Sequence, residues 1–438
     1  MARIQIDRRS FLKTAGRGVV GLGAAATWFS PRALARVESA GRQVAGLAPE
    51  AVARDESYWF AIQQAFSVDR SLINLNNGGV CPSPRVVTEA VERYTWQQEE
   101  APVYTMWQLL EPRSETVRAG LAELFGCDAE EIAITRNASE SLEILLQGLP
   151  LERGDEVLTS TQDYPRMQTT LDQRARREGI AVRRIQVPVA PADPLDIVRA
   201  FEAGIGPRTK VILVCHVINL TGQIVALRPL CELARARGIE VVVDGAHSFA
   251  HFEFTQAEIG CDYFGTSLHK WLLAPKGTGM LYVRRDKIPR VWPLFAAPPE
   301  MDGDIRKFEE IGTHPASIRV ATGDAIAFHR GIGGARKEAR LRYLKNYWAE
   351  RLRELPRVRF HSSFDPRQSC ALFNVAIEGV DPEALGDTLW RRHRILTAAI
   401  SHPECPGIRV TPNVYTSLEE LDRFVGVMEQ VARRGLPT

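Results

Sequence analysis

The chain has 438 residues, of which 25% are charged and 45% are hydrophobic, as in an ordinary globular enzyme. This composition excludes collagen-like, disordered and small disulfide-bonded proteins. Lysine and arginine total 55 against 53 aspartate and glutamate residues, so the formal charge of +2 gives no reason to expect a nucleic-acid partner. At this length we expect one large domain and one smaller domain.

The first 35 residues have the features of an export signal in the right order. A basic start with paired arginines, Asp7–Lys13, precedes a modest apolar stretch, Gly18–Phe29, and a small-residue box, Ala33–Ala35. This arrangement resembles a bacterial twin-arginine signal, which implies the twin-arginine translocase as a partner, cleavage after Ala35 and a periplasmic location. The apolar stretch is shorter than the ~20 residues that span a bilayer, so no stable membrane anchor is expected.

Behind the signal, composition and pattern divide the chain into three further parts. Residues 36–57 are polar and rich in alanine and glycine without a clear period, and we predict a linker. Residues 58–325 are predicted to form the large domain, with helices in 58–125 partly joining the small one. Residues 326–438 are predicted to be a small α+β domain.

Short apolar, β-branched runs alternate with helical patterns between residues 130 and 285, which predicts an α/β fold with parallel strands and crossover helices. We expect strands at Ile132–Thr135, Glu156–Thr159, Val182–Val187, Val211–Val217, Glu240–Asp244 and Met280–Val283. Helices are predicted at Ser139–Gln147, Tyr164–Arg177, Leu195–Ala203 and Leu227–Arg237. In the small domain we expect helices at Ala335–Leu355, Glu383–Arg392 and Leu418–Arg433, and strands at Ala371–Glu378 and Ile408–Val410.

The seven cysteines are an odd number without paired short spacing. Neither a zinc site nor a disulfide framework is therefore indicated, and no metal is expected. Most of these cysteines are expected to be small buried apolar residues.

Two polar groups follow buried segments of the predicted sheet. Asp244 ends the apolar run Glu240–Asp244, and Lys270 lies 26 residues further on in a Ser-x-His-Lys turn. Open α/β sheets bind ligands at the carboxyl ends of their strands. A buried aspartate needs a cationic or hydrogen-bonding partner, such as a pyridinium nitrogen. A partly deprotonated lysine can bond to an aldehyde. Pyridoxal 5′-phosphate needs both groups, so it is the cofactor that these residues predict.

The segments Asp244–His247, Ser267–Lys270 and Pro275–Tyr282 occur in an ordered set. This set resembles the class V, fold-type I pyridoxal-phosphate enzymes, a family of cysteine desulfurases, isopenicillin N epimerase-like proteins, kynureninases and some aminotransferases. The resemblance runs from about Asn74 to the C-terminal region. It implies a large domain with a mostly parallel, seven-stranded type of sheet flanked by helices, and a smaller α+β domain.

The resemblance also implies roles for individual residues. Lys270 resembles the lysine that bonds to the cofactor, Asp244 the partner of its ring nitrogen, and His247 a contact of its phenolic oxygen. Further cofactor contacts are implied on the phosphate side at Ala138, Ser139, Ser267 and His269. Tyr164 is implied to stack on the ring face, and Asn219 to lie near the phenolic oxygen.

Three positions extend the predicted site beyond the cofactor. Thr313, in Gly312–Pro315, resembles a loop residue that reaches the phosphate of a second subunit, which implies a homodimer with sites completed across its interface. Arg409 matches an arginine that binds an α-carboxylate, a task suited to its planar fork. Asn77 resembles part of a loop that lines the substrate pocket. Both imply an amino-acid-like small-molecule substrate.

The sequence leaves the reaction open. Lys270 alone can shuttle a proton, which favours transamination, whereas an epimerase needs a second proton relay on the opposite face. A desulfurase needs an activated cysteine, and Ala398–Pro403 holds none, while Cys405 is displaced from the expected position. Sulfur transfer is therefore disfavoured, and a carbon–sulfur lyase stays open. A non-catalytic cofactor-binding protein remains an alternative. A nicotinamide enzyme is disfavoured because no Gly-x-Gly-x-x-Gly turn follows the first strand.

The export signal and the fold together suggest the biological process in which the protein acts. An export signal on a class V chain is similar to periplasmic enzymes that modify siderophore side chains in pyoverdine maturation, an analogy of address and fold only. We therefore expect amino-group or Cα chemistry on an amino acid or a peptide-linked amine, in the tailoring of a secreted metabolite.

Overall fold

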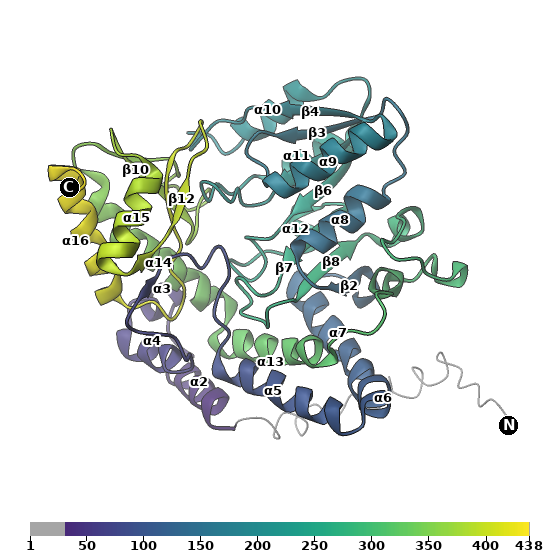
Figure 1. The fold of residues 1–438 in the computed structure, drawn as a ribbon, viewed down its shortest axis with the longest axis horizontal. Helices are drawn as coiled ribbons and strands as arrows, with labels where there is room; N and C mark the ends of the chain where they lie inside the picture. The colour runs from purple at the N-terminus through teal and green to yellow at the C-terminus, as the bar shows by residue number, and fades with distance from the viewer. Residues whose placement is uncertain (1–30, 438) are drawn as a thin grey trace.

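A seven-stranded sheet forms the centre of the larger part of the molecule (Figure 1). The computed structural model describes residues 31–437. The strand order is β2 (Ile132–Thr135), β8 (Gly279–Val283), β7 (Tyr263–Ser267), β6 (Glu240–Asp244), β5 (Thr209–Cys215), β3 (Glu156–Ser160) and β4 (Ala181–Ile185). Strand β8 runs antiparallel to both of its neighbours and the other pairs are parallel, so the mostly parallel α/β sheet is confirmed.

The sheet contains one strand that the sequence analysis missed. Strand β7 is only five residues long, and Gly265 breaks its apolar run. The glycine is needed there, because a Cβ atom would lie 2.9 Å from the Cβ of Ser141 on the neighbouring helix. Two predicted strands are also shifted: β4 and β5 end two residues earlier than expected, at Ile185 and Cys215.

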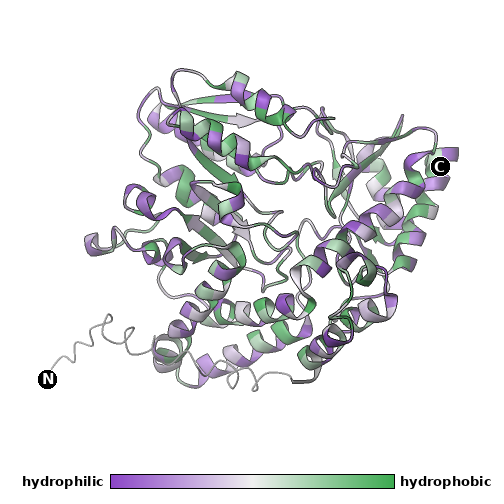
Figure 2. Ribbon diagram, turned by 180° about the vertical axis from the view of Figure 1, so that it is seen from behind, coloured by the Kyte–Doolittle hydropathy of each residue, from purple (hydrophilic) through white to green (hydrophobic). Residues whose placement is uncertain are grey.

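Helices cover both faces of this sheet because successive side chains alternate between the faces. On β6, Val242 packs on one face, against α8 (Ala138–Gly148) and α9 (Pro165–Glu178). Val241 and Val243 pack on the other face, in a cluster with residues of α7 (Ser114–Phe125) and α11 (Leu227–Ala236). Figure 2 shows the central strands of this sheet as mostly hydrophobic, whereas the edge strand β4 carries Arg183 and Arg184. Helices α10 (Asp196–Gly204) and α12 (Gln256–Ile259) complete this part of the chain.

The smaller part is built on an antiparallel sheet in the order β12 (Ala398–Ile400), β13 (Gly407–Val410), β10 (Phe373–Ile377) and β9 (Val358–Phe360). Helices α14 (Gly334–Arg353), α15 (Pro382–His393) and α16 (Leu418–Arg434) pack beside it. Trp348 of α14 is fully buried in their shared core. Strand β1 (Ile73–Asn74) pairs with β11 (Ile395–Leu396), which joins the chain before the large sheet to this part.

The predicted linker at residues 36–57 is wrong, because the chain is helical there. Helices α2 (Pro31–Gln43) and α3 (Pro49–Val52) precede α4 (Glu56–Gln63). Val37 and Val44 are buried in the main core and lie seven residues apart on one face of the helical segment. The alanine-rich and glycine-rich composition had obscured this helical period.

The predicted export signal lies mostly outside the described residues, which begin at residue 31. Its Ala33–Ala35 box falls within α2. In the part of the chain that the structure describes, no helix combines the length and apolarity needed to cross a membrane.

Two long helices lie under the sheet. Helices α5 (Arg85–Glu100) and α13 (Ala316–Ile332) pack along each other, and α6 (Pro102–Tyr104) and a π-helical turn at Thr105–Leu110 follow α5 (Figure 1). The carboxyl ends of the parallel strands face the smaller part of the molecule, and the candidate site lies there.

Candidate active site

The site is a pocket of about 200 Å³ at the carboxyl ends of the parallel strands. Strands β5, β6 and β7 end at Cys215, Asp244 and Ser267, and parallel pairing brings these three ends to one edge. Nine predicted site residues line this one pocket: Ala138, Ser139, Tyr164, Asn219, Asp244, His247, Ser267, His269 and Lys270.

Lys270 and His247 form the centre of the pocket. The Nζ atom of Lys270 lies 3.1 Å from Nε2 of His247. Burial lowers the pKa of Lys270 to about 8, because a charged ammonium group is poorly solvated there. Burial and the nearby lysine also hold the pKa of His247 well below its usual range, so its imidazole is neutral. A lysine of this kind has a substantial neutral fraction near pH 7 and can act as a nucleophile or a base.

Asp244 provides a buried carboxylate beside this pair. Its Oδ1 atom accepts a hydrogen bond of 2.9 Å from the backbone N–H of Ala246, and the residue is 6% exposed. Burial raises the pKa of Asp244 to about 6, since few groups here stabilise its charge. A cationic ring nitrogen in the pocket would supply the missing counter-charge.

The N-terminus of α8 forms one end of the pocket. Asn137 caps the helix, its side chain accepting from the N–H of Glu140. The N–H of Ala138 donates to Oγ of Ser267 over 2.9 Å, which joins the helix start to the end of β7. At Gly279 a Cβ atom would lie 2.6 Å from Cα of Asn137, so only glycine lets β8 pass there. Backbone N–H groups and the helix dipole make this end suited to a phosphate.

Two polar atoms of residues that line the pocket lack a partner in the described part of the chain. They are Oδ1 of Asn219 and Nδ1 of His247, both buried. Unpaired buried polar atoms are costly, so both are suited to a ligand with hydrogen-bonding atoms. The Tyr164 side chain, 38% exposed at the start of α9, supplies an aromatic wall.

Arg409 lies next to the pocket but is not part of its immediate lining. Its Nη1 donates to the carbonyl of Asn219 and its Nη2 donates to Oδ1 of Asn76, and each of these two hydrogen bonds has a length of 3.0 Å. Both partners are neutral, Nε has no partner among the described residues, and burial lowers the pKa of Arg409 to about 10. A Cβ atom on Gly78 would lie 3.5 Å from Cζ of Arg409 and 3.4 Å from Cε1 of His247, so both residues flank this glycine.

The prediction that Asn77 lines the substrate pocket is wrong. Asn77 is fully buried: its Nδ2 donates to the carbonyls of Asn74 and Thr411, and its Oδ1 accepts from the hydroxyl of Tyr415 over 2.6 Å. The side chain fastens the loop to the small domain. The neighbouring Asn76 faces Arg409 instead, and the sequence gives no signal that distinguishes the two asparagines.

Thr313 lies outside the pocket in this chain. It is exposed on the loop before α13. The predicted contact with a second subunit therefore stays a prediction.

Taken together, these groups fit pyridoxal 5′-phosphate. The start of α8 with Ser267 and His269 would hold the phosphate, and Asp244 the ring nitrogen. Lys270 would bond to the aldehyde. The unpaired atoms of Asn219 and His247 would face the remaining polar substituent of the ring. The aldehyde would be the point of attachment, and the pyridine ring would supply the electron sink for bonds at the substrate Cα.

Comparisons with known proteins agree with the fold. Residues 72–402 match the model of the family described as Aminotransferase class-V. An isopenicillin N epimerase of Streptomyces clavuligerus is 31% identical over 85% of this chain and 98% of its own. A probable cysteine desulfurase of Xylella fastidiosa (strain Temecula1) is 26% identical over 85% of this chain and 94% of its own.

Solved structures show the same fold. A C-DES mutant with glycine covalently linked to its PLP cofactor superposes with a TM-score of 0.76 at 23% identity, covering 84% of this chain and 98% of its own. The cysteine desulfurase of Thermococcus onnurineus NA1 gives a TM-score of 0.75 at 24% identity, covering 86% and 98%. The fold-type I architecture is thereby confirmed. The chain belongs to the aminotransferase class-V family, and its cofactor is pyridoxal 5′-phosphate.

Proposed function

We propose that the protein is an enzyme that moves a proton at the Cα of an amino acid or peptide-linked amine with a free carboxylate. One observation carries this proposal. Arg409 is a buried guanidinium beside the Lys270–His247 pair, with only neutral oxygens as hydrogen-bond partners. A buried cation without an anionic partner is costly, and a substrate carboxylate would supply that partner in bidentate geometry.

The surrounding residues fit this chemistry. When bound, pyridoxal 5′-phosphate weakens the bonds at the substrate Cα by drawing electrons into its ring. Asp244 would hold the ring nitrogen in its protonated form by placing a negative charge against it. Nζ of Lys270, with its lowered pKa, accepts the Cα proton and returns it, and His247 lies 3.1 Å away to orient Nζ. Arg409 fixes the carboxylate and so decides which substrate bond faces Lys270.

Epimerisation is the first candidate reaction. The similarity to isopenicillin N epimerase at 31% identity, over nearly the whole of that protein, supports it. Transamination is the second candidate, supported by a lysine that can both take up and deliver a proton without a second relay. The two reactions differ in whether the amino group leaves the substrate.

Persulfide-forming sulfur transfer lacks a suitable cysteine. Cys405 is fully buried on the loop between β12 and β13, and burial raises its pKa to about 12. A desulfurase needs a thiolate nucleophile. This geometry therefore supports Cα proton transfer over attack by Cys405.

The test uses the enzyme loaded with pyridoxal 5′-phosphate in D₂O. A panel of L- and D-amino acids and short peptides is followed by NMR for loss of the α-proton signal, and by chiral chromatography. Inversion without loss of the amine supports epimerisation, and formation of a keto acid with a spectral change of the cofactor supports transamination. Exchange of amino-acid amides as fast as of free acids contradicts the role of Arg409. No exchange with any compound that bears a carboxylate contradicts the proposal.

We further propose that two copies of the chain assemble around the site. Large apolar side chains are exposed near the α5 end and in the loop after β8, among them Trp96 at 75% and Trp292 at 71%. We propose that a second copy of the chain covers this apolar surface, because Thr313 is exposed and is therefore accessible to a second subunit. Light scattering that gives a monomer for the loaded enzyme would refute this. A Thr313→Ala variant is expected to weaken phosphate binding without changing the assembly.

Export through the twin-arginine pathway is proposed from the sequence of residues 1–35. In bacterial fractionation the intact chain is expected in the periplasm, and a variant with Arg8→Lys and Arg9→Lys is expected to stay in the cytoplasm. Recovery of the double variant from the periplasm would contradict export through the twin-arginine pathway.

A further inference from the structure

A buried histidine that the proposed mechanism does not use lies behind the Lys270–His247 pair. His251 follows β6 at the same turn as His247 and is 1% exposed. Its Nδ1 atom lies 2.7 Å from the carbonyl oxygen of His247. On the opposite side of the ring, the backbone N–H of Ala371 donates to Nε2 over 3.0 Å.

These two contacts fix the state of the ring. Because Nε2 accepts a hydrogen bond, the proton is on Nδ1, which donates to the carbonyl of His247. Burial lowers the pKa of His251 to about 3, so the ring is neutral throughout the physiological range. His251 therefore cannot serve as a proton switch and acts through its two hydrogen bonds and its flat surface.

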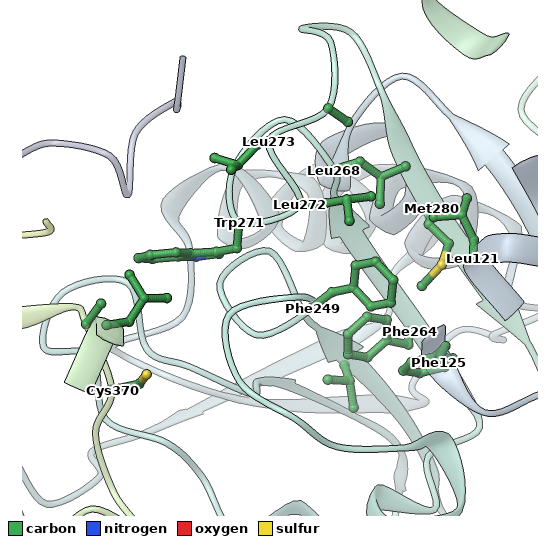
Figure 3. Close-up of a cluster of buried hydrophobic side chains, with 14 of the residues drawn as sticks. Leu121, Phe125, Phe249, Phe264, Leu268, Trp271, Leu272, Leu273, Met280 and Cys370 are labelled. Carbon is green, nitrogen blue, oxygen red and sulfur yellow. The ribbon is translucent and has the colours of Figure 1, made fainter. Parts of the chain in front are cut away.

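The flat surface lies on Trp271, the residue that follows Lys270. The two rings are parallel within 2°, with centroids 3.7 Å apart. Figure 3 shows Trp271 next to Leu272 and Leu268 on the turn after β7, with the segment of Cys370 beyond it. The His251 side chain thus contacts three segments: the backbone of His247, the ring of Trp271, and the backbone of Ala371, which leads into β10.

A second buried group holds the same turn from another direction. Lys337 of α14 is 1% exposed, and its Nζ donates to the carbonyl of Trp271. Burial lowers the pKa of Lys337 to about 7. The Trp271–Leu272 peptide is therefore held by a side chain from the small part of the molecule, and the Trp271 ring by the His251 stack.

We propose that His251 and Lys337 are positioning residues that set the distance between Lys270 and His247. Neither residue lines the pocket. Their hydrogen bonds fix the backbone on both sides of the pair, so their loss would let Nζ and Nε2 drift apart. An error of about 1 Å in such a geometry can cost on the order of 100-fold in rate.

The test measures capture of pyridoxal 5′-phosphate by Lys270 rather than turnover. The bond between Nζ and the aldehyde carbon forms with loss of one water and needs no oxidant. Cofactor is removed from the enzyme and added back, and growth of the visible absorbance that survives dialysis gives the capture rate. Unfolding in urea measures the stability of each variant separately.

Three substitutions of His251 separate its contacts. His251→Asn keeps a donor near the Nδ1 position, His251→Gln keeps an acceptor near the Nε2 position, and His251→Phe keeps only the flat ring. We expect the capture rate of the His251→Asn variant to lie within about threefold of wild type. The capture rates of the His251→Gln and His251→Phe variants should be lower by about tenfold or more. Equal capture by all three variants, or equal slowing of all three, overturns the role of the Nδ1 donor.

Substitutions of Lys337 give an independent arm if the His251 variants fold poorly. Lys337→Gln can still donate to the carbonyl of Trp271, whereas Lys337→Met fills the same space without a donor. We expect slow capture for Met, restored by Gln, with both variants folded. Wild-type capture by the Met variant overturns the role of Lys337.

The inference rests on Lys270 being the cofactor lysine of the proposed function. The two can fail separately. A wild-type protein that captures no cofactor refutes the proposed function, whereas normal capture by wild type and by every variant refutes only the positioning role.

Discussion

The two sides of the pocket come from different parts of the molecule. The strand side consists of Asp244, Ser267 and Lys270, which lie at or just after the ends of hydrogen-bonded strands of one sheet. The loop side consists of Asn76, on the loop after β1, and Arg409, on strand β13 of the smaller sheet, and their side chains meet through a hydrogen bond of 3.0 Å. The strand side thus belongs to one sheet, whereas the loop side joins a loop residue to a strand of the other sheet.

This difference indicates a division of labour. Groups that must meet the cofactor in one geometry stand on the sheet, whose ladder resists displacement. The groups assigned to the substrate lie outside that sheet, on the loop after β1 and on β13 of the smaller sheet, so they can change without disturbing its ladder. Substitutions on the strand side should therefore affect the chemistry, and those on the loop side should affect substrate choice.

Replacing the central lysine should have the largest effect. Lys270→Ala removes both the covalent attachment of the cofactor and the base, so kcat should fall by about 10²- to 10⁴-fold or more. Dialysis of the loaded variant followed by absorbance spectroscopy tests the attachment. Lys270→Arg is the matched control, since it keeps the charge without a usable amine. Activity of the Ala variant within tenfold of wild type would contradict the assigned role.

Asp244 should give the cofactor-free protein a distinctive pH dependence. Its carboxyl has a pKa near 6 in the folded state against 3.8 in the unfolded chain, so folding favours the protonated form. Stability should therefore fall as the pH rises from about 4 to 6, by up to about 3 kcal/mol. Urea unfolding at several pH values should show this slope, and Asp244→Asn should flatten it. An unchanged slope in the variant would contradict the assignment.

Arg409 tests the loop side. Arg409→Met should raise KM for carboxylate substrates by about 10- to 100-fold, because a charge-assisted hydrogen bond contributes about 1.5–3 kcal/mol. Capture of pyridoxal 5′-phosphate should stay near wild type. Arg409→Lys keeps the charge without the planar fork and should recover part of the loss. A failure of cofactor capture in the Met variant would show that the two sides are not separable.

The adjacent asparagines of the loop sharpen the comparison further. Asn77→Ala should lower the free energy of unfolding by about 1–3 kcal/mol, because buried hydrogen-bond partners would be left unpaired. Asn76→Ala removes one hydrogen bond, the one to Arg409, so it should lower stability less than Asn77→Ala does and should alter KM. Thermal unfolding and steady-state kinetics of both variants separate the two roles. The reverse pattern would mean that Asn77, not Asn76, serves the substrate.

The smallest effect is expected at Cys405. Its thiol is buried, with a raised pKa, and Sγ lies 3.9 Å from Nδ1 of His402. Cys405→Ser should leave Cα proton exchange within about twofold of wild type, since a conservative change outside the pocket is nearly neutral. Sulfide release from L-cysteine is assayed in parallel. Sulfide release by wild type that the variant loses would revive sulfur transfer.

Much of the strand side could be predicted from the sequence. The run Glu240–Asp244 predicts a buried strand with a carboxylate at its end, and the predicted bounds match those of β6. Nine of the predicted cofactor contacts meet in one pocket because parallel strands carry them to one edge. The short β7 was missed because Gly265 interrupts the only apolar signal that it has.

The loop side could not be derived in the same way. Whether Asn76 or Asn77 faces the pocket depends on which of them meets Thr411 and Tyr415, residues more than 300 positions away. The helix that replaced the predicted linker is likewise stabilised by the core on which Val37 packs. Local propensity was weak in both places, and distant contacts decided the outcome.

The sequence by itself determined the α/β class from its local runs, and its ordered motifs, through their resemblance to a known family, indicated the family and the cofactor. The roles of Lys270 and Asp244 toward that cofactor stay predictions. Only the tertiary structure decided that Lys270 and His247 lie 3.1 Å apart and that His251 lies flat on Trp271 behind them. It also decided that Arg409 is a buried cation with neutral partners. Those facts depend on segments that are distant in the chain, and the packing that joins them leaves no local mark in the sequence.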